Sequence, residues 1–335
     1  MNPKSHMPTT NDDRRPLPVI RAALIDISGT LHVGKGAIPG AIDACRRLIA
    51  LQKIQQNNFK VLFLTNTSKI SSTTLLSTLR SIGFDEDAIP SSDYIMTSVG
   101  ATKRYLLEKK LRPYCLLEDD LISTDFYGVD TIDETDDDDN ENNNAFDEAG
   151  SGPNCVLVGL APNKFNYDRL NTAYRLLNKL KRKDDKWRQE MDPADHQQTS
   201  RQSQPPPPRL IVIHRATYYR DSDHELSLGP GGFISLLEGA SGVSAHVIGK
   251  PSVNFYNEAL TYLGISDPAH AVMVGDDVVG DIGGAINAGL GCAILVKTGK
   301  YVHGDESGRK TDGVVPTLVM DSIAEAVDYI CTQYS

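Results

Sequence analysis

At 335 residues the chain is long enough for two domains with hydrophobic cores, and 40% hydrophobic with 23% charged residues is ordinary for a globular protein in water. The formal net charge of −10 argues against nucleic acid as a partner. No apolar run reaches the roughly eighteen residues of a membrane span, and residues 1–20 lack the apolar core of a secretion signal. We therefore expect a cytoplasmic protein with no membrane partner, and residues 1–19 are expected to form a disordered arm.

The five cysteines are scattered along the chain and include no Cys-x-x-Cys pair. This pattern is typical of reduced thiols in a cytoplasmic protein and does not favour a zinc site.

The first predicted element that carries chemistry is a short apolar strand at residues 22–25, which is too short before its glycine to be a helix. Asp26 follows it directly, with Ser28 and Thr30 just beyond. Ligands bind at the carboxyl ends of strands in an open parallel sheet, so Asp26 is well placed to be a nucleophile or a metal ligand. The alternative is that Asp26 only caps the turn that follows.

The next elements continue an alternating pattern. Residues 39–51 have the apolar spacing of a helix, and residues 61–64 form a second apolar strand that ends in Thr65 and Asn66. A further helix is expected at residues 72–81. Strand, helix and strand in this order begin a right-handed parallel unit.

Residues 93–244 supply no further polar group of this kind, and they are expected to form an inserted cap. Helical spacing at residues 99–110 and 167–181 and apolar strands at 114–117, 156–160 and 210–213 predict a second α/β unit there. Two stretches within it are too polar to bury and are predicted to be surface insertions. They are the acidic tract at 130–152 and the glutamine- and proline-rich segment at 182–208.

The chain then returns to the first unit. A strand at residues 246–248 ends in Lys250, and a strand at 271–275 ends in Asp276 and Asp277, with Asp281 close behind. Further elements are expected at residues 255–263 (helix), 292–296 (strand) and 322–330 (a closing helix capped by Asp321). We therefore expect an α/β fold with a doubly wound parallel sheet, built from residues 20–92 and 245–335, into which the cap at 93–244 is inserted.

Taken together, these strand ends resemble the motifs of the haloacid dehalogenase-like (HAD) phosphatases. The ordered set is Asp26, then Thr65–Asn66, then Gly249–Lys250–Pro251, then Gly275–Asp276–Asp277 with Asp281. The likeness covers about residues 20–330 without the two polar insertions, and segments 26–32, 157–162 and 296–301 are most similar to one small branch of the family. The resemblance implies a Rossmann-like core with the large cap that one subgroup inserts between its second and third motifs. A phosphate-loop ATPase is excluded, because Pro251 follows the lysine and the earlier glycine is missing.

The resemblance also implies roles for the predicted site residues. Asp26 would be the nucleophile that forms an aspartyl-phosphate, and it would bind Mg²⁺ together with Asp276. Asp277 or Asp281 would act on the metal through water, although Asp281 could instead cap a helix. Thr65 and Asn66 would bind phosphate oxygens by hydroxyl and backbone N–H. A carboxylate beside a phosphate dianion needs cations to offset the repulsion, and Lys250 would provide one by bridging Asp26 and the phosphate.

Ser28 departs from the family pattern, which usually has an acid/base Asp two residues after the nucleophile. The backbone carbonyl of Ser28 can bind Mg²⁺, and its hydroxyl can orient water or phosphate. It cannot be a general acid, a role that typically contributes 10²- to 10⁴-fold in rate. Two hypotheses follow. The protein is a phosphatase whose substrate, such as a phosphoramidate, pyrophosphate or activated aryl phosphate, needs little help from that Asp, or it is a weak or inactive protein that binds phosphorylated ligands as a scaffold.

Specificity is expected to lie in the cap, because a large lid covers the leaving group and excludes water. The candidates are His214, Arg215, Tyr218, Tyr219 and the glycine-rich turn at 228–232, each of which could instead serve only packing or flexibility. The expected partner is a small phosphorylated substrate or a phosphorylated amino-acid side chain. The resemblance is also compatible with a homodimer formed through the cap.

Overall fold

The computed structural model describes residues 19–55, 58–68, 72–131, 152–190, 205–220, 225–309 and 313–333. The predictions for residues 1–18, for most of the acidic tract and for 191–204 lie outside these ranges. Within them, none of the helices is both long enough and apolar enough to span a bilayer.

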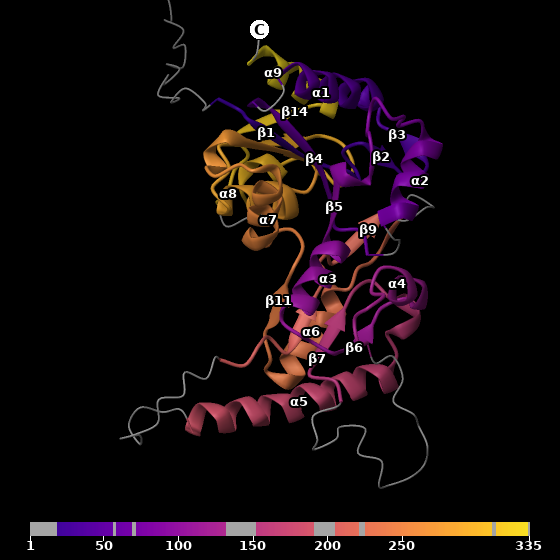
Figure 1. The fold of residues 1–335 in the computed structure, drawn as a ribbon, viewed down its shortest axis with the longest axis vertical. Coiled ribbons are helices and arrows are strands. Elements are labelled where there is room, and N and C mark those ends of the chain that lie inside the picture. The colour runs from indigo at the N-terminus through magenta and orange to yellow at the C-terminus, as the bar shows by residue number, and fades with distance from the viewer. Residues whose placement is uncertain are drawn as a thin grey trace, which may run out of the picture.

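The core is a six-stranded sheet whose paired strands are all parallel, in the order β14-β13-β12-β1-β4-β5. Figure 1 shows this sheet and its helices in the upper half of the molecule. Its strands are β1 (Ala22–Asp26), β4 (Lys60–Thr65), β5 (Ile95–Thr97), β12 (Ala271–Gly275), β13 (Cys292–Val296) and β14 (Leu318–Met320).

Helices cover both faces of this sheet because its strands are apolar on both sides. Ala22 and Leu24 of β1 face one hydrophobic cluster, and Ala23 and Ile25 face the other. The first cluster includes α7 (Val253–Leu263) and α8 (Gly284–Asn287), and the second includes α1 (Ala41–Gln55), α2 (Ser72–Ile82) and α9 (Ile323–Thr332). This arrangement confirms the doubly wound α/β fold predicted from the sequence.

The cap contains a second parallel sheet of four strands, in the order β11-β8-β7-β6. It lies below the core in Figure 1, with α5 across the bottom. One face packs on α5 and α6, and the other carries residues of the first cluster together with α3 and α4. The elements are β6 (Pro113–Leu116), β7 (Cys155–Val158), β8 (Leu210–Val212), β11 (Ala245–Val247), α3 (Ser98–Glu108), α4 (Asp119–Thr124), α5 (Tyr167–Glu190) and α6 (Gly231–Ser241).

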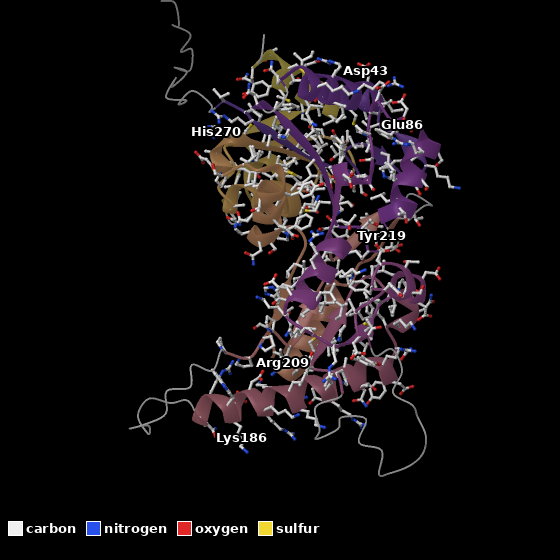
Figure 2. All side chains as sticks on the ribbon, in the orientation of Figure 1. Asp43, Glu86, Lys186, Arg209, Tyr219 and His270 are labelled. Carbon is white, nitrogen blue, oxygen red and sulfur yellow. The ribbon has the colours of Figure 1, made fainter. Side chains whose placement is uncertain are left out.

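Two short antiparallel pairs complete the strands. The pair β2 (His32–Val33) and β3 (Gly36–Ala37) follows β1 in the core, and the hairpin of β9 (Tyr218–Arg220) and β10 (Leu226–Leu228) projects from the cap. Figure 2 shows Tyr219 of this hairpin between the two halves of the molecule.

The expected change from core to cap is wrong by a few residues at each crossing. Strand β5 lies beyond residue 92 but pairs with β4 in the core sheet, and β11, expected in the core, pairs with β8 in the cap sheet. An apolar strand reads the same in either sheet, so its pairing partner is not visible in its own residues.

The expectation that a polar insertion begins at residue 182 is also wrong. Helix α5 continues to Glu190, and Asp184 on this continuation is nearly buried against Arg209, which Figure 2 labels beside the helix. Lysine, arginine, glutamine and glutamate are good helix formers, so a charged sequence here extends the helix.

The carboxyl ends of the two sheets meet. Ser68, three residues beyond β4, accepts a hydrogen bond from the backbone N–H of Leu160 beyond β7 (3.1 Å) and bonds to His214 beyond β8 (2.9 Å). The strand ends of the core therefore face the cap, and any ligand bound at them lies between the two halves.

Candidate active site

Three carboxylates and one ammonium group meet at the carboxyl edge of the core sheet. Asp26 is the last residue of β1, Asp276 follows β12, and Asp281 lies in the π-helical turn η6 (Val278–Gly283). One oxygen from each of these carboxylates lies within 4.8 Å of the other two. All three side chains are buried, as is Lys250, which contacts two of them.

Lys250 binds the nucleophile candidate directly. Its Nζ donates to Asp26 Oδ1 (2.5 Å) and to Asp281 Oδ1 (2.7 Å), and its side chain is only 4% exposed. Burial alone would lower the pKa of Lys250, but the two carboxylates outweigh it and raise that pKa above its ordinary value. Lys250 is therefore a fixed positive charge beside Asp26.

Asn66 positions Lys250 through the backbone. Its side-chain Nδ2 donates to the Lys250 carbonyl (2.8 Å), and its Oδ1 accepts the Lys250 N–H (3.0 Å). The Asn66 amide is thus occupied by the chain, which leaves its backbone N–H as the group available to a phosphate. Thr65 is fully buried, and its hydroxyl accepts the N–H of Thr67 (3.1 Å).

Asp276 is held in place from two loops. Its Oδ2 accepts the backbone N–H of Lys300 (2.6 Å), and its Oδ1 lies 3.4 Å from the Thr30 hydroxyl. Gly29 and Gly299 both have positive φ angles, and a Cβ at either position would overlap the Asp276 carboxylate. Burial and then the charges of Asp26 and Asp281 raise the pKa of Asp276 well above its ordinary value.

Asp277 and Asp281 lie at the start of the π-helical turn, and the residue that caps it is not the one considered from the sequence. Asp277, not Asp281, caps the helical turn, because its Oδ1 accepts the N–H groups of Val279 (3.0 Å) and Gly280 (2.8 Å). Burial alone would raise the pKa of Asp277, but Lys300 outweighs it and the pKa is lowered. Asp281 binds Lys250 through Oδ1, and its Oδ2 accepts the backbone N–H of Asp277 (3.1 Å). Burial, partly offset by that ammonium and reinforced by the Asp26 charge, raises the pKa of Asp281 to about 7.

Ser28 is next to Gly29, which packs against the Asp276 carboxylate, but its own side chain does not join the cluster. It is exposed, and its hydroxyl makes no hydrogen bond to the other predicted site residues, all of which the structure describes.

The residues present fit a divalent cation of the magnesium type. Asp26 Oδ2 is buried and has no hydrogen-bond partner, and the neighbouring donors are carboxylate oxygens, the ligands that Mg²⁺ prefers. Asp26, Asp276 and Asp281 are the residues that would hold it.

Sequence reasoning missed Lys300 as a site residue. Its backbone holds Asp276, its ammonium pairs with Asp277 Oδ2 (2.9 Å), and the nearby Thr298 hydroxyl donates to the Gly29 carbonyl (2.6 Å). The signal was available, because residues 297–300 follow the apolar strand at 292–296 as directly as Asp276 follows its own strand.

The cap candidates divide into two groups. His214 is buried, bonds to Ser68 of the core and accepts the Ala216 N–H at Nδ1 (3.3 Å). Burial, with a smaller contribution from the Lys300 charge, lowers the pKa of His214 to about 4. Arg215 is instead paired with Glu238 inside the cap (2.9 Å), and Tyr218 lies exposed on the hairpin.

Comparisons with known proteins agree with this geometry. The family described as haloacid dehalogenase-like hydrolase matches residues 23–124, and the family described as HAD-hydrolase-like matches residues 247–326. The haloacid dehalogenase-like hydrolase domain-containing protein 2 of Bos taurus is 39% identical over 311 residues, which cover 93% of this chain and 96% of that protein. The phospholysine phosphohistidine inorganic pyrophosphate phosphatase of Homo sapiens is 33% identical over 318 residues, with 93% and 94% coverage.

Both relatives belong to the small branch that the sequence segments indicated. Among solved structures, a glycerol phosphate phosphatase from Mycobacterium tuberculosis in complex with magnesium has a TM-score of 0.64 at 19% identity. The likeness covers 92% of this chain and 76% of that chain, and at this identity it shows a shared fold.

Proposed function

Because the chain belongs to the haloacid dehalogenase-like hydrolases, we propose that it is a magnesium-dependent phosphatase that works through a phosphorylated Asp26. The observation that carries this proposal is the Asp26 side chain, with one oxygen bound to Lys250 and the other buried without a partner. An oxygen in that position is free to take a metal ion or a phosphorus atom.

The charges around Asp26 set the requirements of the site. Four carboxylates, those of Asp26, Asp276, Asp277 and Asp281, face the two ammonium groups of Lys250 and Lys300, which leaves a formal charge of −2. A bound Mg²⁺ would bring that charge to zero and offset the negative charge of an incoming phosphoryl group.

The chain's own residues then carry the transfer. Asp26 attacks phosphorus while Lys250 holds its other oxygen, and the backbone N–H groups beyond β4 bind the phosphoryl oxygens. The bond to the leaving group breaks, and its electron pair stays on the leaving atom. Water next attacks the aspartyl-phosphate, which releases inorganic phosphate and restores the Asp26 carboxylate, with the proton passing to solvent or phosphate.

Ser28 narrows the substrate class. With no carboxylic acid at that position, the site favours substrates whose leaving group departs without a proton from the enzyme. Pyrophosphate, phosphoramidates and activated aryl phosphates meet this condition, and the name of the human relative includes pyrophosphate, phospholysine and phosphohistidine.

The test is turnover of p-nitrophenyl phosphate, pyrophosphate and a phosphohistidine or phospholysine peptide, with and without magnesium. We expect magnesium-dependent turnover that falls at least about 10⁴-fold in Asp26→Asn, because removing a catalytic nucleophile costs rates of this order. The matched control is Asp43→Asn, since Asp43 is exposed on α1 at the end of the core far from the cap (Figure 2).

Two outcomes would contradict the proposal. Turnover that survives in Asp26→Asn excludes Asp26 as the nucleophile. Binding of inorganic phosphate by the wild type without turnover of any of these substrates supports the scaffold hypothesis instead.

A further inference from the structure

Lys300 is a half-buried cation to which the proposed reaction assigns no role of its own. Its backbone N–H holds Asp276, and its Nζ donates to Asp277 Oδ2 (2.9 Å). The other two ammonium hydrogens donate to no residue that the structure describes, and the side chain is 29% exposed. Part of this side chain is therefore accessible, and its ammonium has hydrogens left to donate to a ligand.

Lys300 differs from Lys250 in the direction that it faces. Lys250 is 4% exposed and uses its ammonium on Asp26 and Asp281 within the core. Lys300 instead lies on the loop that follows β13, at the carboxyl edge of the core sheet, and its side chain is 29% exposed. That edge faces the cap, as the contacts of Ser68 with Leu160 and His214 show, so Lys300 lies on the cap side of the core.

In-line transfer makes the cap side the side of the leaving group. Asp26 attacks phosphorus from the end of a core strand, so the bond that breaks points away from the core sheet. Lys300, which is anchored at Asp276 on the edge that faces the cap, lies on the leaving-group side, whereas Lys250 is bonded to the nucleophile.

We infer that Lys300 binds the leaving-group side of the substrate and selects phosphorylated compounds whose leaving group carries negative charge, with pyrophosphate as the simplest. The inference rests on the proposed phosphatase function. When the P–O bond to the leaving group breaks, its electron pair stays on the leaving oxygen. The Lys300 ammonium stabilises that oxygen by hydrogen bonding and keeps its own protons, so the leaving phosphate departs as an anion. Lys300 thus stabilises the leaving oxygen by its positive charge, whereas an acidic residue at position 28 would stabilise it by donating a proton.

The experiment compares Lys300→Met and Lys300→Arg with the control Lys297→Met. Lys297 lies on the same loop but pairs with Asp321 at the surface, so its loss removes an equal charge outside the site. In Lys300→Met we expect kcat/KM to fall about 100-fold for pyrophosphate and less than about fivefold for p-nitrophenyl phosphate, because removing one hydrogen-bond donor aimed at developing charge costs 10²- to 10³-fold. Lys300→Arg is expected to recover most of the loss.

Calorimetry separates a substrate contact from a structural role. In Lys300→Met, the Mg²⁺ dissociation constant should stay within about threefold of wild type or become smaller, because a positive charge is removed from a cation site. Equal losses on both substrates, or Mg²⁺ binding weakened more than about tenfold, would show that Lys300 only organises Asp276 and Asp277, and would overturn the inference.

A second measurement keeps this test independent of turnover. Pyrophosphate is titrated into Asp26→Asn and into Asp26→Asn with Lys300→Met, both with magnesium, and the second is expected to bind at least about tenfold more weakly. Equal affinities overturn the Lys300 inference even if the wild type is an active phosphatase. A wild type without turnover overturns the proposed function, and this titration still decides the role of Lys300.

Discussion

The two parallel sheets place very different residues at edges that face each other. In the core, the ends of β1, β12 and β13 carry Asp26, Asp276 and the loop of Lys300. Oxygens of the two aspartates lie within 4.8 Å of each other, and the Lys300 backbone N–H binds Asp276. In the cap, β7 and β8 end in Leu160 and His214, whose contacts with Ser68 are neutral hydrogen bonds. The same sheet architecture therefore provides a charged site in one half and a largely neutral cover in the other.

This difference between the core edge and the cap edge shows what a buried aspartate cluster requires. Buried carboxylates raise one another's pKa and need cations, and the core edge supplies lysines and a fit for a metal. Lys250 is the exception in the comparison, because it follows a strand of the cap sheet but binds the core aspartates. Three substitutions test this division, in order of expected effect.

Lys250→Met should have the largest effect. It removes the cation between Asp26 and Asp281 and should lower kcat on p-nitrophenyl phosphate about 10³-fold, the upper range for a single electrostatic contact. Lys297→Met should stay within about twofold of wild type. A kcat within tenfold of wild type in Lys250→Met would contradict the claim that the residue following β11 is needed in the charged site of the core.

Ser28→Asp should have the next largest effect, and it should be a gain. Ser28 is exposed, so a carboxyl group fits there, and a general acid should raise turnover of an alkyl phosphomonoester such as glycerol phosphate about 10- to 100-fold. Turnover of p-nitrophenyl phosphate should change much less, because its leaving group needs little protonation. Ser28→Asn has a similar shape but no acid, and it should show no gain; an equal gain in both variants would contradict this explanation of Ser28.

His214→Gln should have the smallest effect on turnover and a measurable effect on stability. Burial lowers the pKa of His214 to about 4 from an ordinary value of 6.5, so between these pH values the unfolded chain binds more protons than the native protein. The free energy of unfolding should therefore fall by up to about 3 kcal/mol as the pH drops from 6.5 to 4.

Denaturant unfolding at pH 7 and pH 4.5 measures this contribution. The wild type should lose more stability than His214→Gln between the two pH values, whereas His303→Gln should behave as wild type because His303 is almost fully exposed. Parallel losses in wild type and His214→Gln would show that the cap edge does not depend on a neutral imidazole.

Much of the fold and several site residues could be predicted from the sequence because one physical rule covered them. Apolar strands that end in polar groups indicated Asp26, Thr65 and Asp276, and the structure places all three at the carboxyl edge of one sheet. The rule could not show which sheet a strand joins, so the strand before Lys250 was placed in the core when it pairs in the cap.

The sequence also could not predict which groups the side chains bind. Nothing local shows that the Asn66 amide binds the Lys250 backbone, or that Asp277 and not Asp281 caps the helical turn. These contacts join residues from different elements or depend on a π-helical turn, and sequence spacing does not determine them.

The backbone bonds between Asn66 and Lys250 have a mechanical consequence. Residues 248–249 connect β11, an edge strand of the cap sheet, to Lys250 beside Asp26. Asn66 holds the backbone of Lys250 to the core. If the cap moves away from the core, the chain must either bend at residues 248–249 or break the two Asn66–Lys250 bonds. In the second case Lys250 also leaves Asp26 and Asp281. Closing the cap would then also return the Lys250 ammonium to Asp26, so domain closure and assembly of the site would occur together.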